Sequence, residues 1–344
     1  KEDMKDQCFK SGKLVFSVEG THPETYAVRR CYLSMPAVRG HRSVHLFRWR
    51  NPKMVAWLTN ESRVAEIRWS STIFLDVETT GFVRDVDTLV FLVGIAYLAK
   101  DSKTSDYRLS IRQYFSRNTL EVGPMLRAIF RKFARPTLIV TFSGSRFDLD
   151  LLKAHAIHRE VPWPWDDVPE LDLARCARKI WKTALKRCNL RTLEREVLGY
   201  QRRVDLTGSE IPERWSEFVH NRNPDVLEPV IWHNIEDLLS LPTLLSAMLD
   251  DLATPKNLGI KEKLALARHA LNIGDEQRTH LLLKKIFREA VEPEDRVMAY
   301  KLQQRVARKR GDIDALRLSR EAMYQEFPHL RRGAPPSSGE DPTS

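Results

Sequence analysis

Apolar residues in the first half of the chain fall into short runs separated by turn residues, which predicts the strands of a sheet. Residues 73–75 and 137–142 are largely apolar runs of the kind that a buried strand requires. Residues 88–98 form a longer run, and residues 108–115 alternate between apolar and polar positions as an exposed strand would. Helical spacing of apolar residues over 120–133 predicts a helix ahead of the last strand. This order predicts an α/β fold, a mixed sheet with helices packed on it.

Helical periodicity dominates the next part of the chain. A turn at 143–148, which begins with three small residues, opens one helix, and residues 171–181 and 190–198 have the pattern of amphipathic helices with many basic side chains. Residues 226–249 form a longer apolar-periodic segment. We expect Pro242 to kink this helix or to end its first part, because proline cannot donate the backbone hydrogen bond of a helix interior.

The C-terminal part is expected to be entirely helical. Residues 255–328 carry no strand signals and contain four helical stretches. The dipeptide Gly274-Asp275 recurs 37 residues later as Gly311-Asp312, and the same offset aligns several apolar positions. This weak repeat predicts helix-turn-helix units of about tetratricopeptide length, and a simple helical appendage is the alternative.

The pattern divides the chain into four parts. We expect a β-rich N-terminal extension of unknown role over residues 1–70, an α/β domain over residues 71–250 and a helical repeat region over residues 255–328. The Pro, Gly and Ser content of residues 329–344 predicts a disordered tail.

Within the N-terminal extension, alternating segments near residues 13–18 and 43–47 suggest strands. Arginines interleave there with aromatic residues. Solvated hairpin faces are the common cause of such a pattern, and a surface that holds a nucleic-acid strand by charge and stacking is the alternative. The arginines are Arg29, Arg30, Arg39, Arg42, Arg48 and Arg50.

Charge and composition favour a polyanionic partner and give no sign of a membrane. The formal charge of +10 and the pI of about 9.5 fit nucleic acid, although solubility alone also selects basic chains. No apolar stretch approaches the length that a bilayer requires. The four cysteines have no C-x-x-C spacing, so we expect reduced thiols and a cytoplasmic location. The chain begins with Lys1 and without the apolar core of a secretory signal, and an upstream piece is expected to be missing.

Two acidic residues one position apart follow the first buried strand. Asp76 and Glu78 point to the same side of that strand, because side chains alternate along it. Carboxylates this close repel each other unless a cation neutralises them or water solvates them. The pair is therefore either part of a metal site or a solvated strand end.

Three further polar residues stand at the ends or on the faces of predicted helices. Asp148 lies in a first turn, where free amides stabilise a carboxylate whether it is a cap or a ligand. His233 and Asp237 are four positions apart and share a helical face, although a histidine on an apolar helix more often bonds a backbone carbonyl. Together with Asp76 and Glu78, the acids supply the oxygen-rich set that two divalent cations about 4 Å apart need in a phosphodiester-cleaving site.

In this order, the motifs D-x-E, F-D after a small-residue turn and H-N-x-x-D resemble the DEDD 3′-to-5′ exonuclease superfamily of the ribonuclease H-like fold. Within that superfamily the chain resembles the YprB-type branch, which joins a ribonuclease H-like domain to a tetratricopeptide-containing C-terminal region. The resemblance covers roughly residues 71–249, and the order of the motifs is more specific than any one of them. Matching stretches outside the acids are Gly94 and residues 112–115, 171–173, 193–199 and 211–212.

The resemblance implies two Mg²⁺ or Mn²⁺ ions, ligated by Asp76, Glu78, Asp148 and Asp237. Asp76 is then expected to bridge both ions. His233 is implied to orient or deprotonate the attacking water, a role that its titration range suits.

This chain departs from the family's usual motifs at two points. His233 and Asp237 are spaced as H-x3-D, whereas the superfamily has either Y-x3-D or H-x4-D at this point. The assignment of His233 as the base is therefore less well supported than the assignment of the metal ligands. Ser143 stands where the YprB-type branch tends to have Asn. Any contact that the Asn side-chain amide makes in that branch is therefore in doubt here.

The function implied is that of a metal-dependent nuclease that trims single-stranded DNA or RNA from the 3′ end. A structure-specific endonuclease on the same site is one alternative. A non-catalytic nucleic-acid or protein adaptor, with the helices of residues 255–328 as its binding surface, is the other. The densest basic segment, between residues 175 and 203, is expected to be a solvated face or a counter-charge for substrate phosphates.

Overall fold

The structure is a computed structural model, and its described residues divide into two compact units. The first unit extends to Ala177 and continues with Arg187–Thr254; the second contains Arg178–Lys186 and begins again at Pro255. The described residues are 17–19, 26–33, 37–44, 51–81, 87–100, 107–143, 147–202 and 206–331. Most of the predicted strand at 13–18, the end of the one at 43–47 and most of the predicted tail lie outside them.

A seven-stranded mixed sheet forms the centre of the first unit, in the order β1-β2-β7-β6-β5-β8-β9. β5 is antiparallel to β6 and parallel to β8, which is in turn parallel to β9. The predicted α/β fold is confirmed. The strands are β1 (Ser17–Glu19), β2 (Tyr26–Leu33), β5 (Thr72–Thr79), β6 (Val90–Lys100), β7 (Tyr107–Phe115), β8 (Leu138–Thr141) and β9 (Glu170–Asp172).

Four strands differ from the sequence prediction. β1 and β2 arise from the segment expected to be a separate extension, yet β2 pairs with β7 and joins the main sheet. β9 occupies the start of a segment predicted to be helix, and α5 begins only at Leu173. β7 was predicted to be exposed, but β2 and β6 cover both of its edges, and its polar residues Ser110 and Gln113 are fully buried. Gln113 donates buried hydrogen bonds to the carbonyl of Ile231 and to Asn234, so its side of β7 is not a solvated face.

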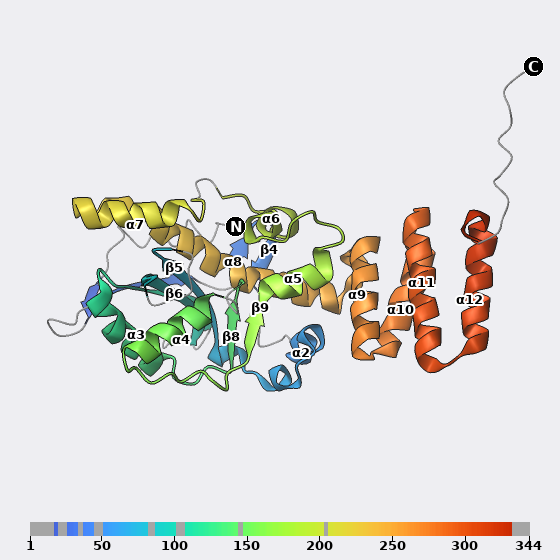
Figure 1. The fold of residues 1–344 in the computed structure, drawn as a ribbon, viewed down its shortest axis with the longest axis horizontal. Helices are drawn as coiled ribbons and strands as arrows, with labels where there is room; N and C mark the ends of the chain where they lie inside the picture. Colours follow the sequence, from blue (N-terminus) through green and yellow to red (C-terminus); the bar gives the residue numbers. More distant parts are fainter. Residues whose placement is uncertain are drawn as a thin grey trace, which may run out of the picture. The chain divides into compact units, whose positions relative to one another are not determined.

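Helices cover both faces of the sheet. α3 (Val122–Lys132) and α4 (Asp148–His158) lie on one side of the strands, and α8 (Glu228–Ala253) lies on the other (Figure 1). The ring of Phe133, which follows α3, packs edge-on against Tyr97 of β6 at 5.1 Å. Because side chains alternate along β6, its even-numbered positions face α8.

α8 continues through Pro242, so the expectation that proline ends its first part is wrong. Residues from Leu238 to Leu249 are all buried. Apolar packing over this length offsets the hydrogen bond that Pro242 cannot donate.

Gly94 allows α8 to approach the sheet closely. It lies in β6 between Asp76 of β5 and Gln113 of β7 in the strand register. A Cβ atom on Gly94 would lie 2.2 Å from Oδ1 of Asn234 and 2.6 Å from Cδ1 of Leu238. A side chain of any size at this position therefore displaces α8 residues that face the sheet.

Shorter elements complete the first unit. A two-stranded hairpin, β3 (Ala37–Arg39) with β4 (Arg42–Val44), packs against α8. A predicted helix at 190–198 is one turn of α-helix followed by a π-helical turn, and α2 and α7 have no counterpart in the prediction. These helices are α2 (Lys53–Thr59), α5 (Leu173–Trp181, of which the first unit contains the part up to Ala177), α6 (Leu190–Leu193), the π-helical turn Glu194–Leu198 and α7 (Glu210–Asn221).

From Pro255 on, the second unit contains α9 (Ile260–Ile273), α10 (Glu276–Glu289), α11 (Pro293–Arg310) and α12 (Ile313–Glu326), successive helices that lie side by side (Figure 1). The repeated dipeptide has the same role in both hairpins. Gly274 and Gly311 end α9 and α11 with left-handed backbones, and the side chains of Asp275 and Asp312 cap the helices that follow. The turn Pro328–Leu330 follows α12, so described structure continues past the predicted start of the tail. In the described part of the chain, no helix is long and apolar enough to cross a bilayer.

Replacing Gly94 with Ala is expected to lower the free energy of unfolding by about 1–3 kcal/mol, the usual cost of overpacking a core. The matched control is Gly123→Ala in α3, where a Cβ meets side-chain atoms no closer than 3.7 Å. That change should leave the stability equal or raise it by up to about 1 kcal/mol, because Ala favours the helix. Urea unfolding of both variants measures the difference, and equal effects would refute the close approach of α8 at Gly94.

Candidate active site

Asp76 and Glu78 lie at the carboxyl end of β5. The parallel strands β5, β8 and β9 end at the same edge of the sheet, and open α/β sheets bind ligands at that edge. Asp148 follows β8 in the chain and is the first residue of α4. A cavity of about 530 Å³ lies at the other end of these strands, beside Ile67, Pro136 and Pro169, and so away from the acids.

A buried amide pair fixes the side chain of Asp76. Nδ2 of Asn234 donates to Oδ2 of Asp76 at 2.7 Å. Nε2 of Gln113 donates to Oδ1 of Asn234 at 2.9 Å and to the carbonyl of Ile231 at 2.9 Å. Gln113 therefore sets the orientation of the Asn234 amide, so that its NH₂ group faces Asp76 across Gly94.

Glu78 is buried, with 5% of its surface exposed. Its Oε1 has no hydrogen-bond partner within the described residues. Burial is the largest cause that raises the pKa of Glu78 well above its ordinary value, and the charge of Asp76 comes next. A buried carboxylate oxygen without a donor is costly, and this cost is removed when a cation binds it.

Asp148 is also buried, which raises its pKa to about 8, with further contributions from the charges of Glu170 and Asp237. The turn before it is held by another acid, since the backbone amide of Ser143 donates to Oδ1 of Asp172 at 2.9 Å. Ser143 has a φ of 64°, a left-handed conformation that Asn adopts more readily than Ser. The departure from Asn thus falls at a position where the backbone itself favours Asn.

α8 supplies the other two predicted site residues. His233 and Asp237 lie one turn apart, with Nε2 of His233 3.6 Å from Oδ2 of Asp237. Their side chains are 14% and 17% exposed, so both remain accessible at the edge of the site. His233 is thus placed beside an acid.

The acids act on one another electrostatically. After burial, the charges of Asp237 and Asp148 raise the pKa of Asp76 well above its ordinary value. The charge of Asp237 also raises the pKa of Glu78 and that of Asp148. In the part of the chain that the structure describes, however, no three Asp, Glu, His or Cys side chains are close enough to ligate a single ion.

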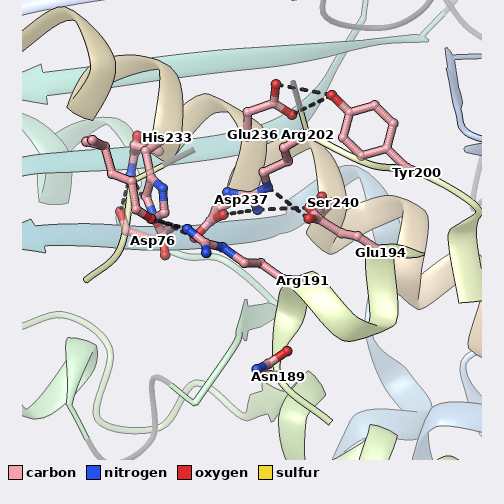
Figure 2. A network of polar contacts seen from close by, with 12 residues as sticks. Asp76, Asn189, Arg191, Glu194, Tyr200, Arg202, His233, Glu236, Asp237 and Ser240 are labelled. Carbon is pink, nitrogen blue, oxygen red and sulfur yellow. Dashed lines mark hydrogen bonds and ion pairs between the residues drawn. The ribbon is translucent and has the colours of Figure 1, made fainter. Parts of the chain in front are cut away.

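Arg202 and Glu194 link the acids to a buried ionic network (Figure 2). Arg202, with 4% of its side chain exposed, donates to Glu194 at 2.8 Å through both Nε and Nη2. Nη2 of Arg202 also contacts Oδ1 of Asp237. Ser240 donates to the same Oε1 of Glu194 that Nη2 of Arg202 contacts. A fixed cationic group therefore stands beside Asp237.

The hairpin residue Arg39 lies at the centre of this network and is fully buried. Its guanidinium contacts Glu194 at 3.2 Å, forms an ion pair with Glu236 and lies 3.7 Å from the ring centroid of Tyr200. The hydroxyl of Tyr200 donates to Glu236 at 3.0 Å. Burial alone lowers the pKa of Arg39, but the charges of Glu236 and Glu194 more than offset this effect. The net pKa is raised, so the guanidinium stays charged. The interpretation of Arg39 as part of a solvated hairpin face, or of a nucleic-acid surface, is wrong.

The donor set at this edge fits a hard divalent cation. Carboxylate oxygens are the ligands that Mg²⁺ and Mn²⁺ prefer. Oε1 of Glu78 is buried without a partner in the described structure, and burial and the charges of neighbouring acids raise the pKa of Asp76 and of Asp148. A cation bound among them would remove both costs.

Residues 73–249 match the family model of the RNase_H superfamily, over slightly more than half of the chain. The chain belongs to the RNase_H superfamily. It is also similar to "Uncharacterized protein YprB" of Bacillus subtilis (strain 168), with 30% identity over 179 residues. That alignment covers 51% of this chain and 41% of the Bacillus protein, so the chain spans less than half of that relative's length.

The RNase_H superfamily domain contains all five predicted site residues, Asp76, Glu78, Asp148, His233 and Asp237. The sequence also carried signals for several supporting residues, because Gly94, Gln113 and Glu194 lie in stretches that match the family outside the acids. Asn234 stands inside the H-N-x-x-D motif. Arg39 and Arg202 gave no signal beyond belonging to basic segments, since their acidic partners are distant in the sequence.

Replacing Asp148 with Asn should make the RNase_H superfamily domain more stable at high pH when divalent cations are absent. The folded protein holds the Asp148 proton with a pKa of about 8, against an ordinary value of 3.8, so this group lowers stability as the pH rises from about 4 to about 8. Thermal unfolding in EDTA should give the Asn variant and the unaltered protein the same Tm near pH 4. Near pH 8 the Tm of the Asn variant should be several degrees higher, because each kcal/mol of stability raises Tm by about 2–4 °C. An advantage that does not change with pH would contradict the raised pKa.

Replacing Arg39 with Met should lower the free energy of unfolding by roughly 3–5 kcal/mol, because it leaves the buried Glu194 and Glu236 without their shared cation. The matched control is Arg63→Met, whose ion pair with Glu61 is largely exposed. Its effect should stay within about 1 kcal/mol. Denaturant unfolding compares the two, and similar losses would show that the Arg39 network does not stabilise the domain.

Proposed function

We propose that this protein is a metal-dependent nuclease that hydrolyses single-stranded DNA or RNA from the 3′ end, as a member of the DEDD group. Membership of the RNase_H superfamily supports a nucleic-acid-cleaving role. The observation that carries the proposal is that Glu78 and Asp148 are buried and Asp76 is half-buried at one edge of the sheet, where burial and then the charges of acidic neighbours raise the pKa of each. Such mutual repulsion has no structural benefit and is typical of a site that binds cations.

In this proposal, Asp76, Glu78, Asp148 and Asp237 hold two Mg²⁺ or Mn²⁺ ions. When bound, these ions supply activation of a water molecule and stabilisation of the leaving oxygen. Asn234 keeps Asp76 in one orientation, since its Nδ2 donates to one carboxylate oxygen and leaves the other available.

His233 is proposed to accept the proton of the attacking water at Nε2. Its side chain is partly exposed, so it can reach a water molecule at the edge of the site. Asp237 lies 3.6 Å from the same nitrogen and would stabilise the imidazolium that forms. The H-x3-D spacing is compatible with this role, because positions four apart face the same side of α8.

The test uses a linear single-stranded oligonucleotide with a dye at its 5′ end, its 3′-phosphorothioate-blocked form and a circular single strand. In Mg²⁺ or Mn²⁺ we expect stepwise shortening of the free linear strand only. Asp76→Asn should reduce the rate by more than about a hundredfold, because loss of partners outside the ligand shell already costs roughly 10–100-fold in metalloenzymes.

The control variant is Asp166→Asn, which changes an acid whose side chain is 64% exposed and bonded to Lys153. Its rate should equal that of the unaltered protein. Cuts in the circular strand would support the endonuclease alternative instead, whereas no cleavage of any substrate in either metal would refute the proposed nuclease.

A further inference from the structure

A small pocket lies beside the acids. It has a volume of about 210 Å³ and lies between α6, the π-helical turn and the residues that follow it. This is below the roughly 300–1,000 Å³ of pockets that hold drug-sized ligands, so it fits a small group. Its lining residues are Arg191, Glu194, Arg195, Tyr200, Gln201 and Arg202.

The pocket has a buried floor and an open mouth. Tyr200, Glu194 and Arg202 are held in the ionic network, so the floor is rigid. Arg191 and Arg195 are exposed and stand one turn apart at the mouth. Arg191 donates to the backbone carbonyl of Leu206, and its side chain extends from α6 toward the side of the network on which Asp237 lies (Figure 2).

The charge of the pocket is positive. Three guanidinium groups line it against one carboxylate, Glu194. The Glu194 carboxylate already accepts hydrogen bonds from Arg39, Arg202 and the Ser240 hydroxyl. Arg195 contacts Glu196 only through an exposed pair, which costs little to exchange for another anion.

We propose that this pocket binds a phosphate of the nucleic-acid backbone next to the phosphodiester that is cleaved. The inference rests on the proposed function, and it assigns to Arg191, Arg195 and Arg202 the task of holding the strand. The guanidinium of Arg202 both lines the pocket and touches Asp237, so a phosphate held there lies one side chain away from the acids. Planar guanidinium groups match phosphate oxygens in pairs, which favours phosphate over an uncharged base.

Binding is measured by fluorescence anisotropy of a short single-stranded oligothymidylate in EDTA, where no hydrolysis occurs. The double variant Arg191→Gln/Arg195→Gln keeps a donor for the Leu206 carbonyl and removes two charges. We expect affinity to fall about tenfold and the salt slope to become shallower by about 0.7 for each lost contact. Arg195→Gln alone, an exposed change, should give part of the same loss, and thermal unfolding checks that each variant is folded.

The control matched to Arg195→Gln is Arg131→Gln, which also removes one charge, from an exposed position on α3 at the opposite face of the sheet. A second arm replaces one phosphate at a time by an uncharged methylphosphonate. In the unaltered protein, one position near the 3′ end should weaken binding most, and the double variant should lose that position dependence. A loss no greater than that of Arg131→Gln, or an unchanged position dependence, would overturn the inference.

The two proposals fail separately. If the unaltered protein binds the oligothymidylate with the expected position dependence but cleaves nothing in Mg²⁺ or Mn²⁺, the nuclease proposal fails and the phosphate pocket stands. If it cleaves but the arginine variants bind as the control does, the phosphate pocket fails and the nuclease proposal stands.

Discussion

The repulsion among carboxylates at one edge of the sheet is the constraint on which the rest of this structure depends. Asp76 and Glu78 leave the same strand on the same side, and Asp148 and Asp237 reach them from α4 and α8. Asp76, Glu78 and Asp148 each have a raised pKa because of desolvation and the charges of their acidic neighbours. Hydrogen bonds and an ion pair from neighbouring residues hold the carboxylates of Asp76 and Asp237 in place.

Two different devices provide that support. Neutral amides hold Asp76, since Gln113 orients Asn234 over a glycine that lets α8 come close to the strands. A charged network holds Asp237 through Arg202, and Glu194 and Arg39 continue that network into the interior. Buried ion pairs of this kind contribute little net stability but penalise any other arrangement of their groups. The network therefore fixes where α6, the π-helical turn and the β3–β4 hairpin lie against α8.

Much of the fold and the acids could be read from local patterns. Continuous apolar runs identified β5, β6 and β8, and the spacing of Asp76 and Glu78 fixed their common side without further information. The fold class was confirmed for the same reason. Whether the five predicted residues ligate metal and move a proton stays a prediction.

The parts that escaped prediction depend on contacts between distant segments. Arg39 pairs with Glu194 and Glu236 across 155 and 197 residues, so nothing near it in the sequence marks it as buried. β2 joins the sheet only through β7, and β9 is too short to interrupt a helical pattern. Pro242 does not end α8, because burial of the helix from Leu238 to Leu249 outweighs the local rule that proline stops a helix.

The central claim is that the carboxylates of Asp76, Glu78, Asp148 and Asp237 together form a divalent-cation site. Its most direct test is a crystal structure of the protein soaked in Mn²⁺, with anomalous diffraction collected to locate the ions. The account predicts two Mn²⁺ ions about 4 Å apart, each bound by oxygens of these four residues, with Asp76 shared between them. Anomalous density that avoids all four carboxylates at saturating Mn²⁺ would contradict it.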